Sequence, residues 1–200
     1  MPDPDDYFEM QRLEALSNTI FGVAMTLLAY NFPKGDTLNG SPVWPTIWTT
    51  YHAQLIALLI SFVVAGLFWF SHQRRLAYQP RAPRSVVYLN LLFLLAIILL
   101  PVTTGLNGAY GDARDIIVLY GCHLTALAGL SGILWLLAGL RRGEPDVAIP
   151  MAFATVAFAL SVLFALIVPQ TSIAQLMWYF AFATPVIDRL LERRRRRQAM

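Results

Sequence analysis

The sequence predicts an all-α integral membrane protein. Of its 200 residues, 57% are hydrophobic and 14% are charged, whereas soluble domains carry about 25% charged residues. Six charge-poor apolar runs each approach the ~20 residues that a helix needs to cross ~30 Å of hydrocarbon. Backbone polar groups have no water partner in lipid, and the sequence lacks the period-two alternation of an outer-membrane barrel, so we expect each run to be a helix.

The predicted spans cover, in chain order, residues 13–32, 47–70, 86–106, 116–140, 147–168 and 172–191. The loops between them hold about a dozen residues at most, so residues 1–200 form a single transmembrane domain. The last span is the weakest, because Asp188 and Arg189 would lie at the level of the lipid headgroups. The N-terminus, MPDPDDYFEM, is acidic where a secretory signal would be basic, so the first span is expected to remain attached.

The basic residues predict the orientation in the cell membrane. A cytoplasmic N-terminus places thirteen of the fifteen Lys and Arg residues on the cytoplasmic side and leaves Lys34 and Arg114 outside. Six spans then put both termini in the cytoplasm. The arginine run from Arg193 to Arg197 directly follows a span, so we expect it to bind anionic lipid of the inner leaflet rather than a nucleic acid.

The first helix should present two distinct stripes. At 100° per residue, five bulky apolar side chains fall within about 80° of one another: Leu16, Ile20, Val23, Leu27 and Tyr30. Beside them runs a stripe of small or hydroxyl residues: Thr19, Gly22, Thr26 and Ala29. Asn18 and Met25 lie on the opposite side and are expected to face the rest of the subunit. The stripes could simply pack against other helices, or several copies could surround an axis where the bulky stripe narrows a pore; the spacing does not decide between the two.

Polar residues gather at the inner membrane interface. The second predicted span ends with Trp69 and His72, and Asn90 lies about one turn inside the third. The first helix brings Arg12, Ser17 and Asn18 to the same level. Because an unpaired polar group in lipid is costly, these residues predict a hydrogen-bonded clamp between the first three helices.

Other chemistry is poorly supported. His52 and His123 have no acidic or histidine partners at ligand spacing, and Cys122 is the only cysteine, so no metal site is predicted. For His123 we expect a hydrogen bond to a neighbouring helix. The acidic residues lie in loops, tails or span ends, which argues against a carboxylate proton relay. The GLSG motif at 129–132 is found in intramembrane serine proteases, but the sixth span has no histidine base, so Ser131 is better explained by close helix packing.

Three motifs in order resemble a known family. The first helix carries Arg12, then Leu16-Ser17-Asn18 and Thr26-Leu27-Leu28, where the family has Arg, three residues, Phe-Ser-Asp and later Thr-Leu-Leu. The second helix ends with Trp69 and His72 (Trp, two residues, His), and the third carries Asn90 followed by an apolar run and Pro101. This pattern is similar to the prokaryotic members of the endolysosomal potassium channel family, the transmembrane protein 175 family. The resemblance is specific over residues 12–105 and only topological beyond them.

The resemblance implies a homotetramer of six-span subunits whose first helices line a central pore for permeant K⁺, without the carbonyl filter loop of ordinary potassium channels and without a bound cofactor. The family's apolar constriction falls on Val23, Leu27 and Tyr30, with the hydroxyl of Thr26 nearby. Its inter-helix polar network corresponds to Arg12, Ser17, Asn18, Trp69, His72 and Asn90. The hydrophobic constriction would act as the gate.

Four positions depart from the family pattern. Asn18 replaces Asp, Leu16 replaces Phe, Val23 is smaller than the usual isoleucine or leucine, and Tyr30 brings a phenol to the outer mouth. The resulting hypothesis is a potassium-selective channel that conducts passively and is not an enzyme. The first alternative is a proton or weakly selective cation channel, and the second is the intramembrane serine protease.

Overall fold

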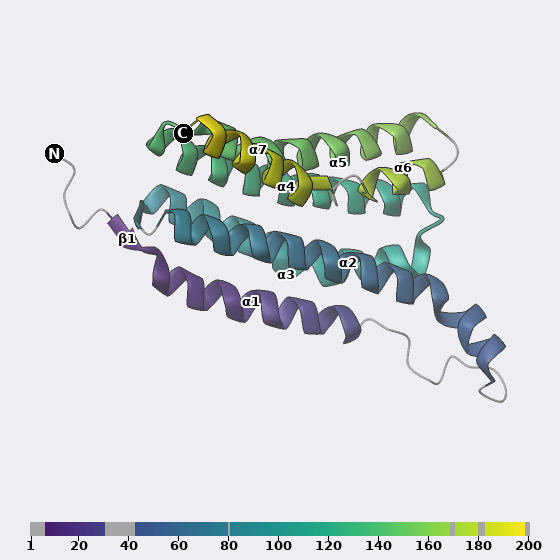
Figure 1. The fold of residues 1–200 in the computed structure, drawn as a ribbon. Coiled ribbons are helices and arrows are strands. Elements are labelled where there is room, and N and C mark those ends of the chain that lie inside the picture. The colour runs from purple at the N-terminus through teal and green to yellow at the C-terminus, as the bar shows by residue number, and fades with distance from the viewer. Residues whose placement is uncertain (1–6, 31–42, 80, 169–170, 180–182, 199–200) are drawn as a thin grey trace.

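The structure is a computed structural model that describes residues 7–30, 43–79, 81–168, 171–179 and 183–198. Its helices are α1 (Met10–Tyr30), α2 (Trp44–Tyr78), α3 (Arg84–Tyr110), α4 (Arg114–Arg142), α5 (Ile149–Ile167), α6 (Thr171–Trp178) and α7 (Thr184–Gln198) (Figure 1). A 3₁₀ turn, Pro145–Ala148, precedes α5. Within the described residues, five helices are long and apolar enough to cross a membrane. The prediction of an all-α, multi-pass membrane protein is confirmed.

Two short strands add a feature that was not predicted. Strand β1 (Tyr7–Glu9) pairs antiparallel with β2 (Arg81–Pro83), with Tyr7 opposite Pro83. Ala82 precedes a proline, which disfavours helical backbone at that position and favours an extended one. The pair ties the segment before α1 to the connection between α2 and α3.

The prediction of one continuous helix over 172–191 is wrong. The structure has two helices there, α6 and α7, and residues 180–182 between them lie outside the described part of the chain. Pro185 lies in the first turn of α7, where its missing N–H is tolerated, whereas its ring would clash inside a continuous helix. Helix α7 is also dominated by arginine, so it lacks the apolar length of a membrane span.

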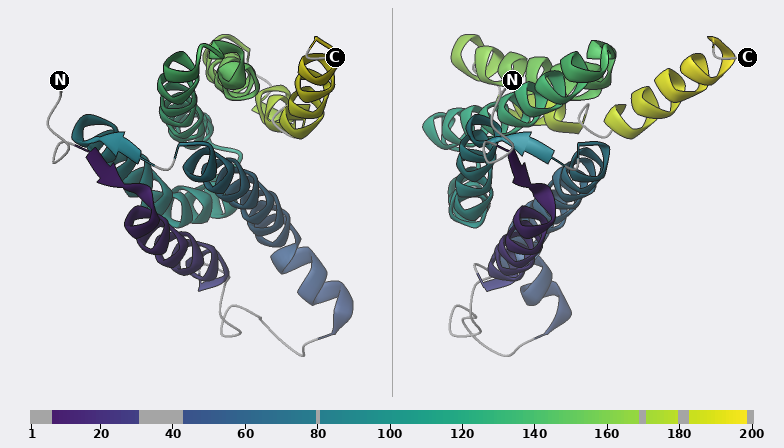
Figure 2. Two further views of the ribbon diagram at one scale, coloured as in Figure 1. Left: turned by 60° about the vertical axis from the view of Figure 1, so that its left-hand side comes forward. Right: turned by 90° about the vertical axis from the view of Figure 1, so that its left-hand side faces the viewer.

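The helices run roughly along one axis, so their ends gather at two ends of the bundle (Figure 1). One end of the bundle holds the starts of α1 and α3, the ends of α2 and α4, and the C-terminal part of α7. We call it the basic end because it carries Arg12, Arg74, Arg84, Arg141 and Arg195. Helix α1 packs on α2 and α3 at one side of the bundle, and α7 lies on the far side (Figure 2).

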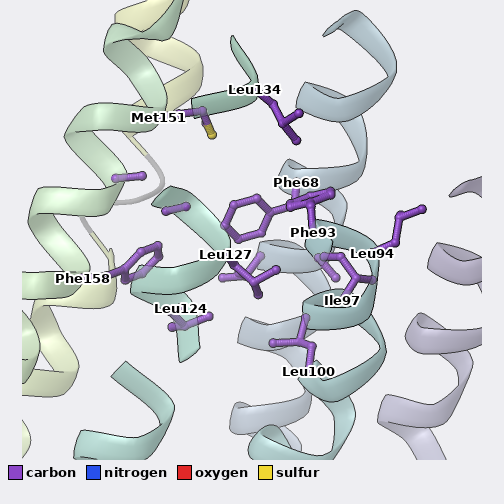
Figure 3. Packing of buried hydrophobic residues seen from close by; sticks show 14 of the residues in the cluster. Phe68, Phe93, Leu94, Ile97, Leu100, Leu124, Leu127, Leu134, Met151 and Phe158 are labelled. Atoms are coloured by element: carbon purple, nitrogen blue, oxygen red, sulfur yellow. The ribbon is translucent and has the colours of Figure 1, made fainter. Parts of the chain in front are cut away.

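The hydrophobic core lies between α2, α3 and α4 (Figure 3). Phe68 and Phe93 meet there edge to face, with ring centroids 6.2 Å apart. Leu124 and Leu127 of α4 are fully buried beside them. Helix α1 adds Phe21, Ala24 and Leu28 to the same buried cluster.

Helices α4 and α5 cross closely at glycines of α4. A Cβ on Gly121 would lie 2.8 Å from Cγ2 of Val162, and a Cβ on Gly132 would lie 3.5 Å from Cβ of Met151. Ser131 is buried within the same stretch. The GLSG motif therefore lies in a closely packed helix contact, as predicted.

Hydrogen bonds connect the helices inside the bundle. Thr104 of α3 donates to the Ser61 hydroxyl of α2 over 2.9 Å, and that hydroxyl lies 2.8 Å from the Tyr120 hydroxyl of α4. His123 of α4 reaches α3 through both ring nitrogens, at 2.7 Å from Oγ1 of Thr103 and 2.9 Å from the Ala96 carbonyl oxygen. The predicted inter-helix hydrogen bond of His123 is confirmed.

Candidate functional site

Helix α1 has one buried face and one exposed face. The buried face repeats at spacings of four, four, three and four residues: Leu13, Ser17, Phe21, Ala24 and Leu28. This spacing keeps the side chains on one stripe of an α-helix, and the stripe meets α2 and α3. Asn18 and Met25, which were expected to face the rest of the subunit, do contact it: the Asn18 side chain is exposed but is hydrogen-bonded to α2, and Met25 is half-buried against the core.

The bulky stripe points away from the subunit. Leu16, Val23, Leu27 and Tyr30 are 43%, 53%, 42% and 71% exposed, respectively, and Ile20 is half-buried. Together they form a row of large apolar side chains that spans most of the helix. Such a row must be covered by lipid or by another subunit, or it must face a narrow aqueous path.

The second stripe, Thr19, Gly22, Thr26 and Ala29, is exposed as well. A Cβ placed on Gly22 would meet no atom within 4 Å. The Thr26 hydroxyl donates its proton to the Val23 carbonyl over 2.8 Å, and the Thr19 hydroxyl donates to the Ala15 carbonyl over 3.0 Å. With their protons used in this way, both hydroxyls present only lone pairs outward, and lone pairs can accept a hydrogen bond or bind a cation.

Asn18 fastens α1 to α2 near the basic end. The indole Nε1 of Trp69 donates to Oδ1 of Asn18 over 3.0 Å. The side-chain amide of Gln73, one helical turn after Trp69, also contacts this oxygen. Gln73 was not among the predicted site residues, although its position four residues after Trp69 places it on the same helix face.

Behind α1 lies a buried polar cluster, which we define as His72, Arg75 and Asn90. The His72 ring stacks on Phe93 with centroids 5.4 Å apart, and it lies 5.8 Å from the ring of Phe21 in α1. A guanidinium nitrogen of Arg75 lies 3.1 Å from Nδ1 of His72 and donates to Oδ1 of Asn90. All three side chains are at most 2% exposed. The cluster therefore joins α2 to α3 and supports α1 from behind.

Arg75 is the member of this cluster that was not among the predicted site residues. It follows His72 by three residues, a spacing that puts both side chains on one helix face toward Asn90. Within the described residues it forms no ion pair with a carboxylate, and its Nη1 has no hydrogen-bond partner. Nε2 of His72 and Nδ2 of Asn90 are also buried without a partner.

The six predicted network residues do not form one continuous clamp among the residues that the structure describes. Asn18 pairs with Trp69, and His72 connects to Asn90 through Arg75. Ser17 is buried but donates to its own Leu13 carbonyl over 2.6 Å. Arg12 is exposed at the start of α1, and no hydrogen bond or ion pair joins it to the described residues.

A second charged contact lies at the basic end. Arg74 of α2 pairs with both Asp188 and Glu192 of α7. Arg195 of α7 donates to the Asp146 carboxylate over 2.9 Å, next to the end of α4. These pairs hold α7 on the bundle, and part of the arginine-rich helix is thereby neutralised. In the described parts of the chain, no group of three or more His, Cys, Asp or Glu side chains is placed to hold a metal ion.

The helices that carry this candidate site are also the part of the chain that resembles known proteins. The model of the family described as endosomal/lysosomal potassium channel TMEM175 matches residues 12–101, which covers α1, α2 and most of α3. A potassium channel of Streptomyces collinus is 33% identical over 107 residues, which is 51% of this chain and 49% of that protein. The chain thus spans about half the length of this relative. A potassium channel of Chamaesiphon minutus is 27% identical over 143 residues, 68% of either chain.

A solved structure agrees in fold over a longer stretch. The crystal structure of a lysosomal potassium-selective channel TMEM175 homolog from Chamaesiphon minutus superposes with a TM-score of 0.79. The alignment covers 90% of this chain and 97% of the other, at 22% sequence identity. At this identity the likeness establishes a common fold, and it extends to the helices beyond α3 that the family model does not reach.

Proposed function

We propose that this chain is a passive, potassium-favouring cation channel whose pore is lined by α1 from several subunits, because residues 12–101 match the TMEM175 potassium channel family and the chain is similar to bacterial potassium channels. The matched family is one of ion channels, so we propose conduction and no enzymatic activity. The preference for potassium is supported by the names of the two bacterial relatives.

The observation that carries the proposal is the exposed face of α1. Val23, Leu27 and Tyr30 are exposed in the single subunit and are spaced by four and three residues. If several subunits surround an axis with this face inward, the three side chains form stacked rings that narrow the path. Apolar rings of this kind stop ions by dewetting, because a hydrated ion cannot pass a short dry constriction.

Thr26 adds oxygen atoms beside this constriction. Its hydroxyl donates to the Val23 carbonyl, which leaves its lone pairs free. Hydroxyl oxygens can replace part of the water that a cation loses at a narrow point. We therefore place Thr26 next to the ion path and propose that Leu27, the next residue, forms the main apolar ring.

Gating would require α1 to move relative to α2 and α3. The helix is held by one apolar face and by the contacts of Asn18 with Trp69 and Gln73 near the basic end. Between residues 21 and 29 of α1, no hydrogen bond of this kind to another helix is found among the described residues. Small tilts of α1 about the Asn18 contact would thus change the width of the rings that Val23 and Leu27 form around the axis.

We propose a homotetramer in the cell membrane with both termini in the cytoplasm. The clustering of arginines at the basic end supports this orientation. At this end the exposed arginines of α7, which include Arg193, Arg194 and Arg197, would contact anionic lipid headgroups. Native mass spectrometry of the purified protein gives the subunit number directly, and a monomer would contradict the shared pore.

Liposome flux tests the channel proposal. Purified protein should dissipate a potassium gradient faster than an equal sodium gradient. Leu27→Ala should increase the leak or reduce the preference for potassium, because a smaller ring wets more easily. Leu163→Ala is the matched control: Leu163 is 50% exposed but lies on α5, away from α1. No flux from wild-type protein, or equal effects of the two variants, would contradict the proposal.

A weakly selective or proton-conducting channel is the alternative function. It is favoured by Val23, which is smaller than the usual family residue and so widens its ring, and by Asn18, which supplies no charge. Equal flux of sodium and potassium through the wild-type protein would support this alternative.

A further inference from the structure

At the end of the bundle opposite the basic end lies a cavity of about 510 Å³, separate from α1. Its walls come from the N-terminal half of α2, the C-terminal end of α3 and helix α6, which converge at this end (Figure 1). Its volume falls within the range of about 300–1,000 Å³ that is typical of small-molecule sites. Its position near the helix ends makes it reachable from water.

Two residues in the wall of this cavity carry a buried side-chain oxygen that has no donor. The side-chain oxygens of Gln54 in α2 and Asn107 in α3 are buried, and neither accepts a hydrogen bond. Both residues line the cavity. A buried acceptor without a donor is unfavourable, so two of them in one cavity call for a ligand or water that donates.

Most of the other polar groups in the wall have already used their protons. The hydroxyls of Thr49 and Thr50 donate to carbonyl oxygens of the preceding turn, at 2.9 Å and 2.7 Å. Nδ1 of His52 lies 3.0 Å from the Trp48 carbonyl, so in the neutral ring Nδ1 carries the proton and Nε2 is an acceptor. Gln175 donates to the Gly111 carbonyl over 3.0 Å. What these groups leave available are mainly lone pairs.

The charge of the wall is negative, which suits a cation in the same way as the free hydrogen-bond acceptors do. Asp112 is the acidic residue of the cavity, and none of the described lining residues is Lys or Arg. A divalent metal ion prefers several carboxylates in its coordination shell, and this wall supplies one. Aromatic side chains of Trp178 and Tyr179 complete the wall and offer ring surface to an organic cation.

From this combination we infer that the cavity lined by Gln54, Asn107 and Asp112 binds a protonated primary amine. The ammonium group would donate its three N–H bonds to acceptors that lack donors, and its charge would be balanced by Asp112. The alkyl part would lie against the aromatic wall. This site is formed within one subunit and does not depend on conduction through α1.

The test is isothermal titration of the full chain in detergent at constant ionic strength and pH 7, where an alkylamine is protonated. The probes are n-butylammonium, tetramethylammonium, which has no N–H, and neutral n-butanol. Wild-type protein should bind n-butylammonium at least about tenfold more tightly than either comparison probe, because a hydrogen bond to a charged group has about this effect.

Two variants locate the site. Asp112→Asn keeps the shape of the side chain but removes its charge, and it should weaken n-butylammonium binding about tenfold. Asp115→Asn is the matched control, because Asp115 is an exposed acid three residues away that does not line the cavity, and its effect should stay below about twofold. Binding of n-butanol as tight as that of n-butylammonium, equal effects of the two variants, or no binding of n-butylammonium would each overturn the inference.

Discussion

The substitution Asn90→Leu tests whether Arg75 is a buried charge that depends on a neutral partner. Arg75 is 1% exposed, and within the described residues its guanidinium has Asn90 and His72 as its only hydrogen-bonding side chains. A hydrogen bond to a charged group contributes about 1.5–3 kcal/mol. Removing Oδ1 of Asn90 leaves this charge nearly unsatisfied, but it also removes Nδ2, a buried donor without a partner. We therefore expect the free energy of unfolding to fall by about 2 kcal/mol.

A second substitution shows the cause of this loss. Arg75→Met keeps an apolar stem of similar length and removes the charge, so that the double variant with Asn90→Leu replaces both interacting groups by apolar ones, a change that often leaves stability nearly unchanged. In the double variant, Asn90→Leu should then be far less destabilising, so the coupling free energy between the two sites should be about 1.5–2 kcal/mol. The assay is reversible unfolding in mixed detergent micelles at one fixed protein concentration. Additive effects of the two substitutions would refute the argument, since they would mean that Asn90 does not act through Arg75.

Two further substitutions test the packing of α4. Gly121→Ala places a Cβ 2.8 Å from the stiff Val162 side chain and should lower the free energy of unfolding by about 1 kcal/mol. The control is Gly22→Ala in α1, whose Cβ meets nothing within 4 Å and which should be neutral or stabilising. Equal thermal stability of the two variants would contradict the close α4–α5 crossing. Tyr120→Phe removes the hydroxyl that lies 2.8 Å from Ser61 and should cost about 1 kcal/mol in the same unfolding assay, and a stability equal to wild type would mean that this hydrogen bond adds nothing to the fold.

The sequence predicted the helical spans well because the bilayer imposes a strong rule. In lipid, every backbone N–H and C=O must be satisfied inside the segment, so long apolar runs have little alternative to a helix. The rule does not fix where a helix ends in water. Helix α2 runs from Trp44 to Tyr78, beyond both ends of the predicted span 47–70. Its additional C-terminal turns carry Arg74 and Arg75, which no hydropathy window would include.

The sixth span shows the opposite limit. Hydropathy favoured one helix across 172–191, and the only sign against it was that Asp188 and Arg189 would lie at the level of the lipid headgroups. The structure begins α7 at Thr184 and pairs Asp188 with Arg74 of α2. The contact forms between residues more than a hundred positions apart, and no local pattern predicts such a pair.

Only part of the buried polar cluster was predicted, again because a sequence pattern does not give the direction of a side chain around its helix. Counting basic residues assigns each one to a side of the membrane but says nothing about its burial. Arg75 was therefore assigned to the cytoplasm with its neighbours, although its spacing from His72 places it on the buried face of α2. Conversely, Arg12 shares a membrane level with this cluster but lies on an exposed part of α1. Membrane depth could be estimated from the sequence, whereas direction around the helix required the structure.

The departures from the family pattern in α1 all fall on residues that the single subunit leaves exposed. Leu16, Asn18, Val23 and Tyr30 belong to this group, whereas Ser17 and Leu28, which match the family, are buried against α2 and α3. A changed side chain that touches little of its own subunit has little effect on the stability of that subunit. Its consequences fall on whatever the exposed face meets. If that face lines the pore, changes at Leu16 and Val23 can adjust conduction and selectivity while the packing of α1 on its subunit stays the same, whereas a change at Asn18 also alters the contacts with Trp69 and Gln73.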